Sequence, residues 1–286
     1  MSDTQLTDHI AGWEPSPTTE FDALDPAQAN RLAATLDLDA HDRSDGAVLP
    51  LPWHWVYFPA WPATSHLGPD GHPEHGHFLP PIPHRRRMFA GSKMRVHNPL
   101  LLGVPTEKRS EVAGMEIKHG RTGEMLFVTV RSTYTQRDAT ALVEDQVLVY
   151  RSDQSTARPF DRAGTELAPS NATWSSEPAP NPMSLFRFSA LTSNAHRIHY
   201  DRPYAAQIEG YPDLVVHGPL LAVYMAALAE DATQKALCNF EFRLQRPVFL
   251  GDRFRVEADP ADGDAVTMRV ISGRDTTHAT ATGVFR

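Results

Sequence analysis

One nine-residue pattern occurs twice in this 286-residue chain, and its two copies lie 148 positions apart. Residues 95–103 and 243–251 both read as Arg, three variable residues, Pro, three apolar residues and Gly. Each copy stands at the same place in a series of segments with the composition of β-strands. An internal repeat of this kind predicts two copies of one structural unit. The length agrees with this, because it suits two domains of about 130 residues each.

The order of the predicted elements is similar in the two halves. Asp25 and Pro26 start a helix at 25–36, and it is followed by strands near 94–97, 111–118, 125–135 and 141–150, with a turn at 120–123. The second half has helices at 184–193 and 218–230, and strands near 237–245, 252–258, 265–272 and 276–285. We therefore divide the chain into an N-terminal domain at 1–151, a linker at 152–182 that is rich in Pro, Ser and Ala, and a C-terminal domain at 183–286.

The helix at 218–230 indicates the architecture. Its residues are apolar on nearly all sides, so the helix has to be enclosed by other elements. A curved antiparallel sheet is the economical way to enclose it. The sequence therefore predicts an α+β fold, a tandem (double) hotdog in which antiparallel sheets are each wrapped around a central helix.

Charge and composition exclude several classes of protein. The 27 Lys and Arg residues against 35 Asp and Glu give a net charge of −8, which does not attract nucleic acid. The most apolar stretch, 214–229, is interrupted by His217, Gly218 and Pro219, so we expect no membrane span. Cys238 is the single cysteine, and the first residues lack a basic segment followed by an apolar one. We expect a cytoplasmic protein.

The segment 188–201 carries the densest group of reactive side chains. Asn194, His196, His199 and Asp201 lie within eight positions, and a His217-Gly218 pair follows at the start of the apolar helix. A histidine is the natural general base near neutral pH. The first half has no equivalent run, so we expect it to have lost catalysis and to contribute only to the substrate channel.

At these residues the chain resembles the MaoC-like hydratases and dehydratases. Their pattern is an aromatic residue, then Ser-Gly-Asp-x-Asn-Pro-apolar-His-x-Asp, then a His-Gly pair that opens the central hotdog helix. The segments 52–58, 67–73, 86–91, 192–201 and 209–220 resemble more closely the branch of the mitochondrial type 2 3-hydroxyacyl-thioester dehydratase and the mesaconyl-C4-CoA and itaconyl-CoA hydratases. The resemblance implies an acyl-thioester hydratase or dehydratase that acts on an acyl-CoA or acyl-carrier-protein thioester and needs no other cofactor.

Hydration of an enoyl thioester needs a base, an acid and donors aimed at the thioester oxygen. By the resemblance, His199 takes the position of the catalytic histidine and Asn194 that of the catalytic aspartate. A carboxamide can orient water but cannot exchange a proton, so His199 would do most of the proton transfer. Gly218 is the predicted oxyanion donor, through its backbone N–H at the helix amino end.

Three further residues are candidates for assistance: His196, Asp201 and His217. Asp201 is equally well explained as the N-cap of a following helix. Four histidines in the loop, His66, His72, His75 and His77, prompt a metal hypothesis that we do not favour, because the surrounding residues indicate an irregular loop and the chemistry needs no metal.

Two groups in the first half are candidates for substrate binding. Arg86 and Arg87 belong to a cationic run that either meets the phosphates of the carrier or forms a solvated turn. Trp53, Trp55 and Tyr57 are expected to close the acyl tunnel by packing, with some contact to substrate.

The sequence leaves several alternatives open. A hotdog thioesterase and a non-catalytic acyl-thioester-binding subunit are the rival functions, and thiol release separates the first of them from hydration. The acyl group, the choice between CoA and carrier protein, and homo-oligomer formation are not determined by the sequence.

Overall fold

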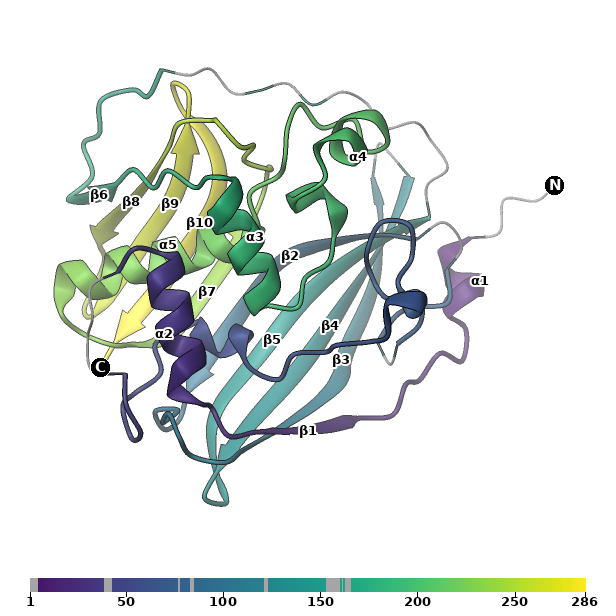
Figure 1. Ribbon diagram of the computed structural model, residues 1–286, viewed down its shortest axis with the longest axis horizontal. Helices are drawn as coiled ribbons and strands as arrows, with labels where there is room; N and C mark the ends of the chain where they lie inside the picture. Colours follow the sequence, from purple (N-terminus) through teal and green to yellow (C-terminus); the bar gives the residue numbers. More distant parts are fainter. Residues whose placement is uncertain are drawn as a thin grey trace.

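Ten strands form one antiparallel sheet in the described part of the chain, which comprises residues 5–38, 43–76, 78–82, 85–120, 123–152, 160, 162 and 166–286 of the computed structural model (Figure 1). The strand order across the sheet is β1-β3-β4-β5-β2-β7-β10-β9-β8-β6. The strands are β1 (Thr18–Asp22), β2 (Arg85–Val96), β3 (Thr106–Gly120), β4 (Gly123–Gln136), β5 (Ala139–Ser152), β6 (Trp174–Ser176), β7 (Leu237–Leu244), β8 (Phe254–Pro260), β9 (Ala265–Ser272) and β10 (Thr276–Phe285). The first five strands make one half of the sheet and the last five make the other half.

The two halves meet where β2 pairs with β7, and this pairing is symmetric. Lys93 lies opposite Glu241, its own counterpart 148 positions further along, and their side chains form an ion pair at 3.0 Å. On either side of this point, Gly91 pairs with Arg243 and Arg95 pairs with Asn239. The spacing of the sequence repeat therefore also relates β2 to β7 at the boundary between the halves.

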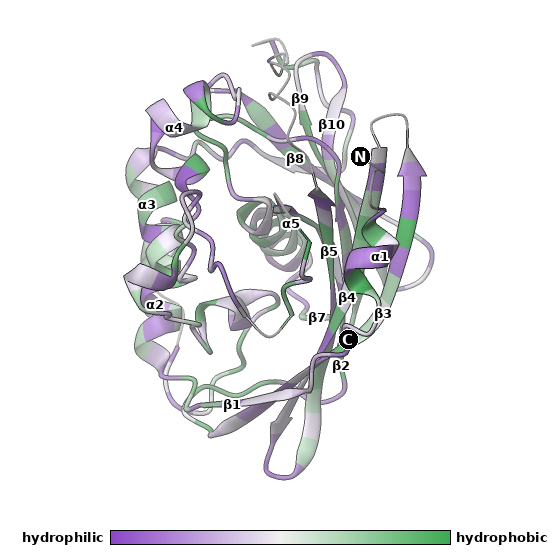
Figure 2. Ribbon diagram, turned by 90° about the vertical axis from the view of Figure 1, so that its right-hand side faces the viewer, coloured by the Kyte–Doolittle hydropathy of each residue, from purple (hydrophilic) through white to green (hydrophobic). Residues whose placement is uncertain are grey.

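The helices form a layer over the sheet, with one helix enclosed between the two. They are α1 (Leu6–Ile10), α2 (Pro26–Thr35), α3 (Pro182–Leu191), α4 (Arg202–Gln207) and α5 (Gly218–Thr233), and the short 3₁₀ helices are η1 (Trp53–Val56), η2 (Thr64–His66) and η3 (Arg197–His199). Figure 2 shows α5 between the sheet and the layer that contains α2, α3 and α4. Ala222, Met225 and Ala226 of α5 have no exposed surface, which agrees with its apolar sequence.

The predicted helices are confirmed, with small changes at their ends. Asp25 caps α2 by accepting the N–H of Ala27 at 2.8 Å. α3 begins two residues before the predicted start, because Asn181 and Ser184 form a reciprocal capping box that precedes the apolar pattern. α5 ends at Thr233, and its C-cap residue Gln234 adopts a left-handed φ of 54°.

The expectation of a central helix in each half is wrong for the first half. In the second half, the N–H of Val216 donates to the carbonyl of Val248, and the N–H of Leu250 donates to the carbonyl of Leu214. In the first half, the N–H of Leu49 donates to the carbonyl of Leu100, and the N–H of Leu102 donates to the carbonyl of Ala47. Residues 47–49 therefore correspond to 214–216, and the chain that follows forms only the single turn η1 where the second half forms α5. Prolines at 50 and 52 and the bulky aromatic residues of η1 do not favour a long helix there.

The main apolar core is continuous between the halves. Leu24, Tyr134 and Leu142 of the first half belong to the same buried cluster as Met225 and Phe240 of the second half. Part of the turn predicted at 120–123 and most of residues 153–165 of the predicted linker lie outside the described residues. Among the described helices, none has the length and apolar composition needed to cross a membrane.

Candidate active site

A tight turn after α3 holds the predicted catalytic run. Ser193 adopts a left-handed φ of 52°, and the N–H of Asn194 donates to the carbonyl of Ser189 at 2.8 Å. The Oδ1 atom of Asn194 then accepts the backbone N–H of His196 at 3.0 Å. After this turn the rings of His196 and His199 meet edge to face, with centroids 5.7 Å apart.

His199 is buried and has a defined tautomer. Only 6% of its surface is exposed, and its Nδ1 lies 2.8 Å from the carbonyl oxygen of Val215. Because a carbonyl can only accept, Nδ1 carries the proton and Nε2 keeps a free lone pair. Burial lowers the pKa of His199 to about 4, helped by the charge of His72 and opposed by the bond to Val215. At neutral pH this histidine is an unprotonated base.

His217 packs directly against His199. The two rings stack with centroids 3.7 Å apart and planes 17° apart. His217 is fully buried, and its Nε2 lies 2.8 Å from the hydroxyl of Ser189, while its Nδ1 has no hydrogen-bond partner among the described residues. Burial, with the neighbouring His199 and His196, lowers its pKa well below the usual value. His217 is thus a neutral ring that supports His199 from one side.

The amino end of α5 lies immediately beyond this stack. His217 is the N-cap residue of α5, and its side chain makes no capping hydrogen bond. A Cβ atom on Gly218 would lie 2.2 Å from Cδ1 of Leu244 on β7, so the glycine allows the helix to pack close to the sheet. The partial positive charge of an uncapped helix end lies next to His199.

A loop of the first half reaches into the same region. The Arg197 N–H donates to the Asp70 carbonyl at 2.9 Å, and the Arg197 guanidinium donates to the Pro69 carbonyl at 2.8 Å. Asp70 Oδ2 lies 3.0 Å from Nδ1 of His72. The ring of His72 contacts the ring of His196, with centroids 4.1 Å apart.

The electrostatics of this cluster are coupled. Burial would raise the pKa of Asp70, but the hydrogen bonds and charge of His72 outweigh it and lower that pKa to about 2. Burial lowers the pKa of His196 to about 2, with further contributions from His72, His199 and Arg87. A negative carboxylate therefore faces His72, while the deeper His196 stays neutral.

Asp70, His72 and His196 form the group of three in the described residues whose potential metal-ligand atoms lie within 4.8 Å of one another. His72 Nδ1 and Asp70 Oδ2 already bond each other, so we interpret the group as a hydrogen-bonded pair beside a third ring. Of the other histidines in the metal hypothesis, His66 and His75 are exposed and His77 lies outside the described residues.

Asp201 has structural partners. Its Oδ1 caps α4 by accepting the N–H of Tyr204 at 3.1 Å, and its Oδ2 forms an ion pair with Arg197 at 2.7 Å. This is the N-cap explanation that the sequence left open. The ion pair with Asp201 also stabilises Arg197, which is the residue that donates hydrogen bonds to the loop of the first half.

The aromatic residues of η1 and its surroundings lie in the first-half core. The hydroxyl of Tyr57 donates to the Asp25 carbonyl at 2.8 Å and accepts the N–H of Ala29, which ties it to the start of α2. Trp53 is 4% exposed. Trp55 donates to Glu144 at 2.9 Å, and its ring meets that of Phe242 on β7, with centroids 5.9 Å apart. Trp53 and Tyr57 belong to the core cluster that both halves share, and Trp55 packs against it.

Arg86 and Arg87 lie at the start of β2, both half-buried. Arg87 is close enough to His196 to contribute to its lowered pKa, as noted above. Burial raises the pKa of Tyr211, and Arg86 is close enough to oppose that rise. Both cations therefore lie beside residues of the second half.

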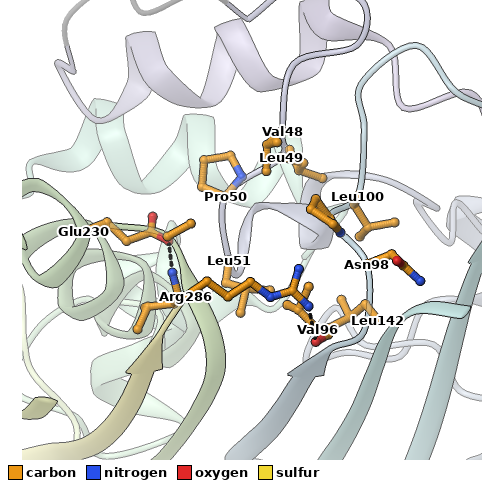
Figure 3. Close-up of a pocket in the computed structure, with 13 residues that line it drawn as sticks. Val48, Leu49, Pro50, Leu51, Val96, Asn98, Leu100, Leu142, Glu230 and Arg286 are labelled. Atoms are coloured by element: carbon orange, nitrogen blue, oxygen red, sulfur yellow. Dashed lines mark hydrogen bonds between the residues drawn. The ribbon is translucent and has the colours of Figure 1, made fainter. Parts of the chain in front are cut away.

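A small apolar pocket of about 50 Å³ lies at the first-half counterpart of the α5 amino end (Figure 3). Pro50 and Leu51 line it where the second half has His217 and Gly218. Glu230 and Arg286 also line this pocket, from the end of α5 and the end of the chain. The first-half counterpart has thus replaced the imidazole and the glycine by apolar side chains.

Sequence reasoning missed Ser189, the carbonyl of Val215, and the Asp70–His72 pair as members of the site. The Asp-x-His spacing of 70 and 72 was visible, because it permits a local turn in which Asp70 Oδ1 accepts the N–H of His72 at 2.9 Å. That spacing gave no sign of the distant contact with His196.

The two-fold sheet, the enclosed α5 and the histidines at its amino end define a tandem hotdog protein, as predicted. The chain belongs to the hydroxyacyl-thioester dehydratase type 2 family, whose model matches residues 52–250.

Relatives with assigned activities agree with this membership. Mesaconyl-C(4)-CoA hydratase of Chloroflexus aurantiacus is 42% identical over 90% of this chain and 90% of its own length. The mitochondrial hydroxyacyl-thioester dehydratase type 2 of Schizosaccharomyces pombe is 27% identical over 71% of this chain and 75% of its own. A Mycobacterium tuberculosis protein described as a double hotdog has a TM-score of 0.57 and 13% identity, over 96% of both chains. This last likeness concerns the fold alone.

Proposed function

We propose that this protein is a hydro-lyase that interconverts an enoyl thioester and a 3-hydroxyacyl thioester. The observation that carries the proposal is the buried, neutral His199 with Nε2 free, next to the uncapped amino end of α5. A base beside a helix amino end is what water addition to a conjugated thioester requires. Membership of the family, and the hydratase among the relatives, support the same reaction.

In the hydration direction His199 Nε2 takes a proton from water as the oxygen attacks the β-carbon. Asn194 orients that water and does not titrate. The backbone N–H of Gly218 and the dipole of α5 stabilise negative charge on the thioester oxygen. His217 keeps the His199 ring in place through the stack described above.

We propose a short acyl-CoA thioester as the substrate. The mesaconyl-C(4)-CoA hydratase among the relatives is named for a short acyl group, which supports this. Arg86 and Arg87 would meet phosphates of the carrier or a carboxylate of a dicarboxylic acyl group, which is the chemistry named in the Chloroflexus relative.

The first test is the loss of enoyl-thioester absorbance on hydration, measured with a panel of short enoyl-CoA esters. His199→Ala should lower kcat by ~100-fold or more, because general base catalysis contributes on that order. The variant should keep the melting temperature of the wild type within a few degrees. Wild-type turnover in a folded His199→Ala protein would remove this residue from the mechanism, and release of free thiol without hydration would identify a thioesterase instead.

A further inference from the structure

The Asp70–His72 pair is held rigidly against the catalytic half by backbone contacts. A Cβ atom on Gly71 would lie 1.9 Å from the carbonyl oxygen of Ala195, so the two loops approach as closely as a glycine allows. Gly71 also has a φ of +91°, a conformation that L side chains rarely adopt. With the two hydrogen bonds from Arg197, this contact fixes the position of His72 relative to His196 and His199.

The imidazoles form a row from the interior toward solvent. His217 stacks on His199 at 3.7 Å, His199 meets His196 at 5.7 Å, and His196 meets His72 at 4.1 Å between ring centroids. Exposure rises along the row, from none at His217 and 6% at His199 to 21% for the side chain of His72. The row ends at the carboxylate of Asp70, whose side chain is 29% exposed.

The reaction has two proton transfers, and a second titrating group beside His199 lets them take place at separate residues. Water addition removes a proton from oxygen and delivers a proton to the α-carbon. Asn194 stands where the resemblance places the catalytic aspartate, and an amide cannot supply that proton. Asp201 is engaged in a helix cap and an ion pair, and His217 is enclosed in the core.

We propose that His72, oriented by Asp70, is the second proton-transfer group of the active site and is contributed by the first half of the chain. This inference rests on the proposed hydratase function. His72 is the catalytic residue of the pair, and Asp70 is a positioning residue that bonds Nδ1 and leaves Nε2 to react.

Hydration takes one proton from water and adds one proton to the α-carbon. His199 Nε2 accepts a proton as the water O–H bond breaks and the C–O bond forms at the β-carbon. The imidazolium of His72 releases its proton to the α-carbon as the enolate-like thioester collapses. His199 is then the protonated ring, and its proton returns to His72 through His196 or through water. Dehydration runs the same steps in reverse.

The experiment compares His72→Ala with His75→Ala, an exposed histidine of the same loop. We expect kcat of His72→Ala to fall by roughly 100-fold or more with KM within about threefold, and His75→Ala to match the wild type. Added imidazole should restore part of the kcat of His72→Ala, because the side chain of His72 is partly exposed to solvent. Asp70→Asn should lower kcat less, with KM unchanged.

Several results would overturn the proposal. A folded His72→Ala protein with kcat within threefold of the wild type would do so, as would a fall in kcat that imidazole does not reverse. Dialysis against EDTA is the control for a metal role: activity lost to EDTA and restored by Zn²⁺ would make the cluster a metal centre. Failure of the hydratase function itself shows separately, because wild-type protein would then hydrate no member of the enoyl-CoA panel.

Discussion

At the scale of single residues, the site depends on which imidazole nitrogen carries a proton. The backbone carbonyl of Val215 fixes the ring of His199, and the hydroxyl of Ser189 fixes the ring of His217. Because burial keeps both rings neutral, they stack without charge repulsion. His199 is therefore available as a base over the whole neutral range.

Gly71 offers a test of the contact between the loops. Gly71→Ala should destabilise the protein by about 1–3 kcal/mol, because it adds a clash with a backbone carbonyl to an unfavourable φ. It should also lower kcat, since His72 moves with the loop. Urea unfolding and steady-state kinetics measure the two effects.

Gly76 is the matched control in the same loop. A Cβ atom there would first meet the end of the flexible Leu79 side chain, at 3.3 Å. Gly76→Ala should therefore leave both stability and kcat near wild type. Equal behaviour of the two alanine variants would contradict the tight docking of residues 70–72.

Much of the site could be predicted from the sequence, because its reactive residues are close together in the chain. Asn194, His196, His199 and the His217-Gly218 pair lie in two short segments, and their spacing is informative. Asp70 and His72 could not be predicted as partners of these residues. Their proximity depends on how a loop more than a hundred positions away docks, which no local pattern determines.

At the scale of elements, the apolar periodicity and the β-propensity of the residues predicted which segments are strands, but they predicted the lengths of the strands less well. β2 extends over Arg85–Val96, although only 94–97 looks like a strand, because the paired neighbours β5 and β7 supply the hydrogen bonds. The missing central helix of the first half was not predicted. The repeat predicts symmetry, whereas the prolines at 50 and 52 are the local signal that disfavours a long helix there.

A glutamate near the end of α5 makes the stability of the protein depend on pH. Burial raises the pKa of Glu230 from 4.5 to about 7, against a smaller opposing effect of the N–H of Leu237. Between these two values the folded protein binds more protons than the unfolded chain, so the free energy of unfolding falls as pH rises from 4.5 to 7. Glu230→Gln stays neutral and should be more stable than the wild type at pH 8 by about 1–3 kcal/mol.

Urea unfolding at pH 5 and pH 8 measures this effect. The gain should shrink toward pH 5, where the wild-type carboxyl is already protonated. Asp231→Asn, at the exposed neighbouring position, removes the same charge and should show no such dependence. A gain of equal size at both pH values would mean that Gln packs better, and would contradict a titration at Glu230.

At the scale of the whole molecule, the halves depend on each other. The apolar core crosses the β2–β7 boundary, and the proposed site takes residues from both sides. Residues 166–286 expressed alone should therefore lack hydratase activity and a cooperative unfolding transition, and co-expression with residues 1–152 should restore both. Activity assays and thermal melts of the fragments check this, and an active, cooperatively folded 166–286 fragment would contradict it.

The symmetric pairing of β2 with β7 at Lys93 and Glu241 has a consequence for how the two halves can come to differ. In a dimer of identical subunits, the positions of Pro50 and His217 would be encoded by one codon and would have to carry the same residue. Covalent fusion separates the two codons. One copy can then keep the imidazole, while the other acquires a proline and contributes a loop that contacts the first copy. Fusion also guarantees that each copy with the imidazole is made with one copy that has the proline, in a fixed ratio that no dissociation can change.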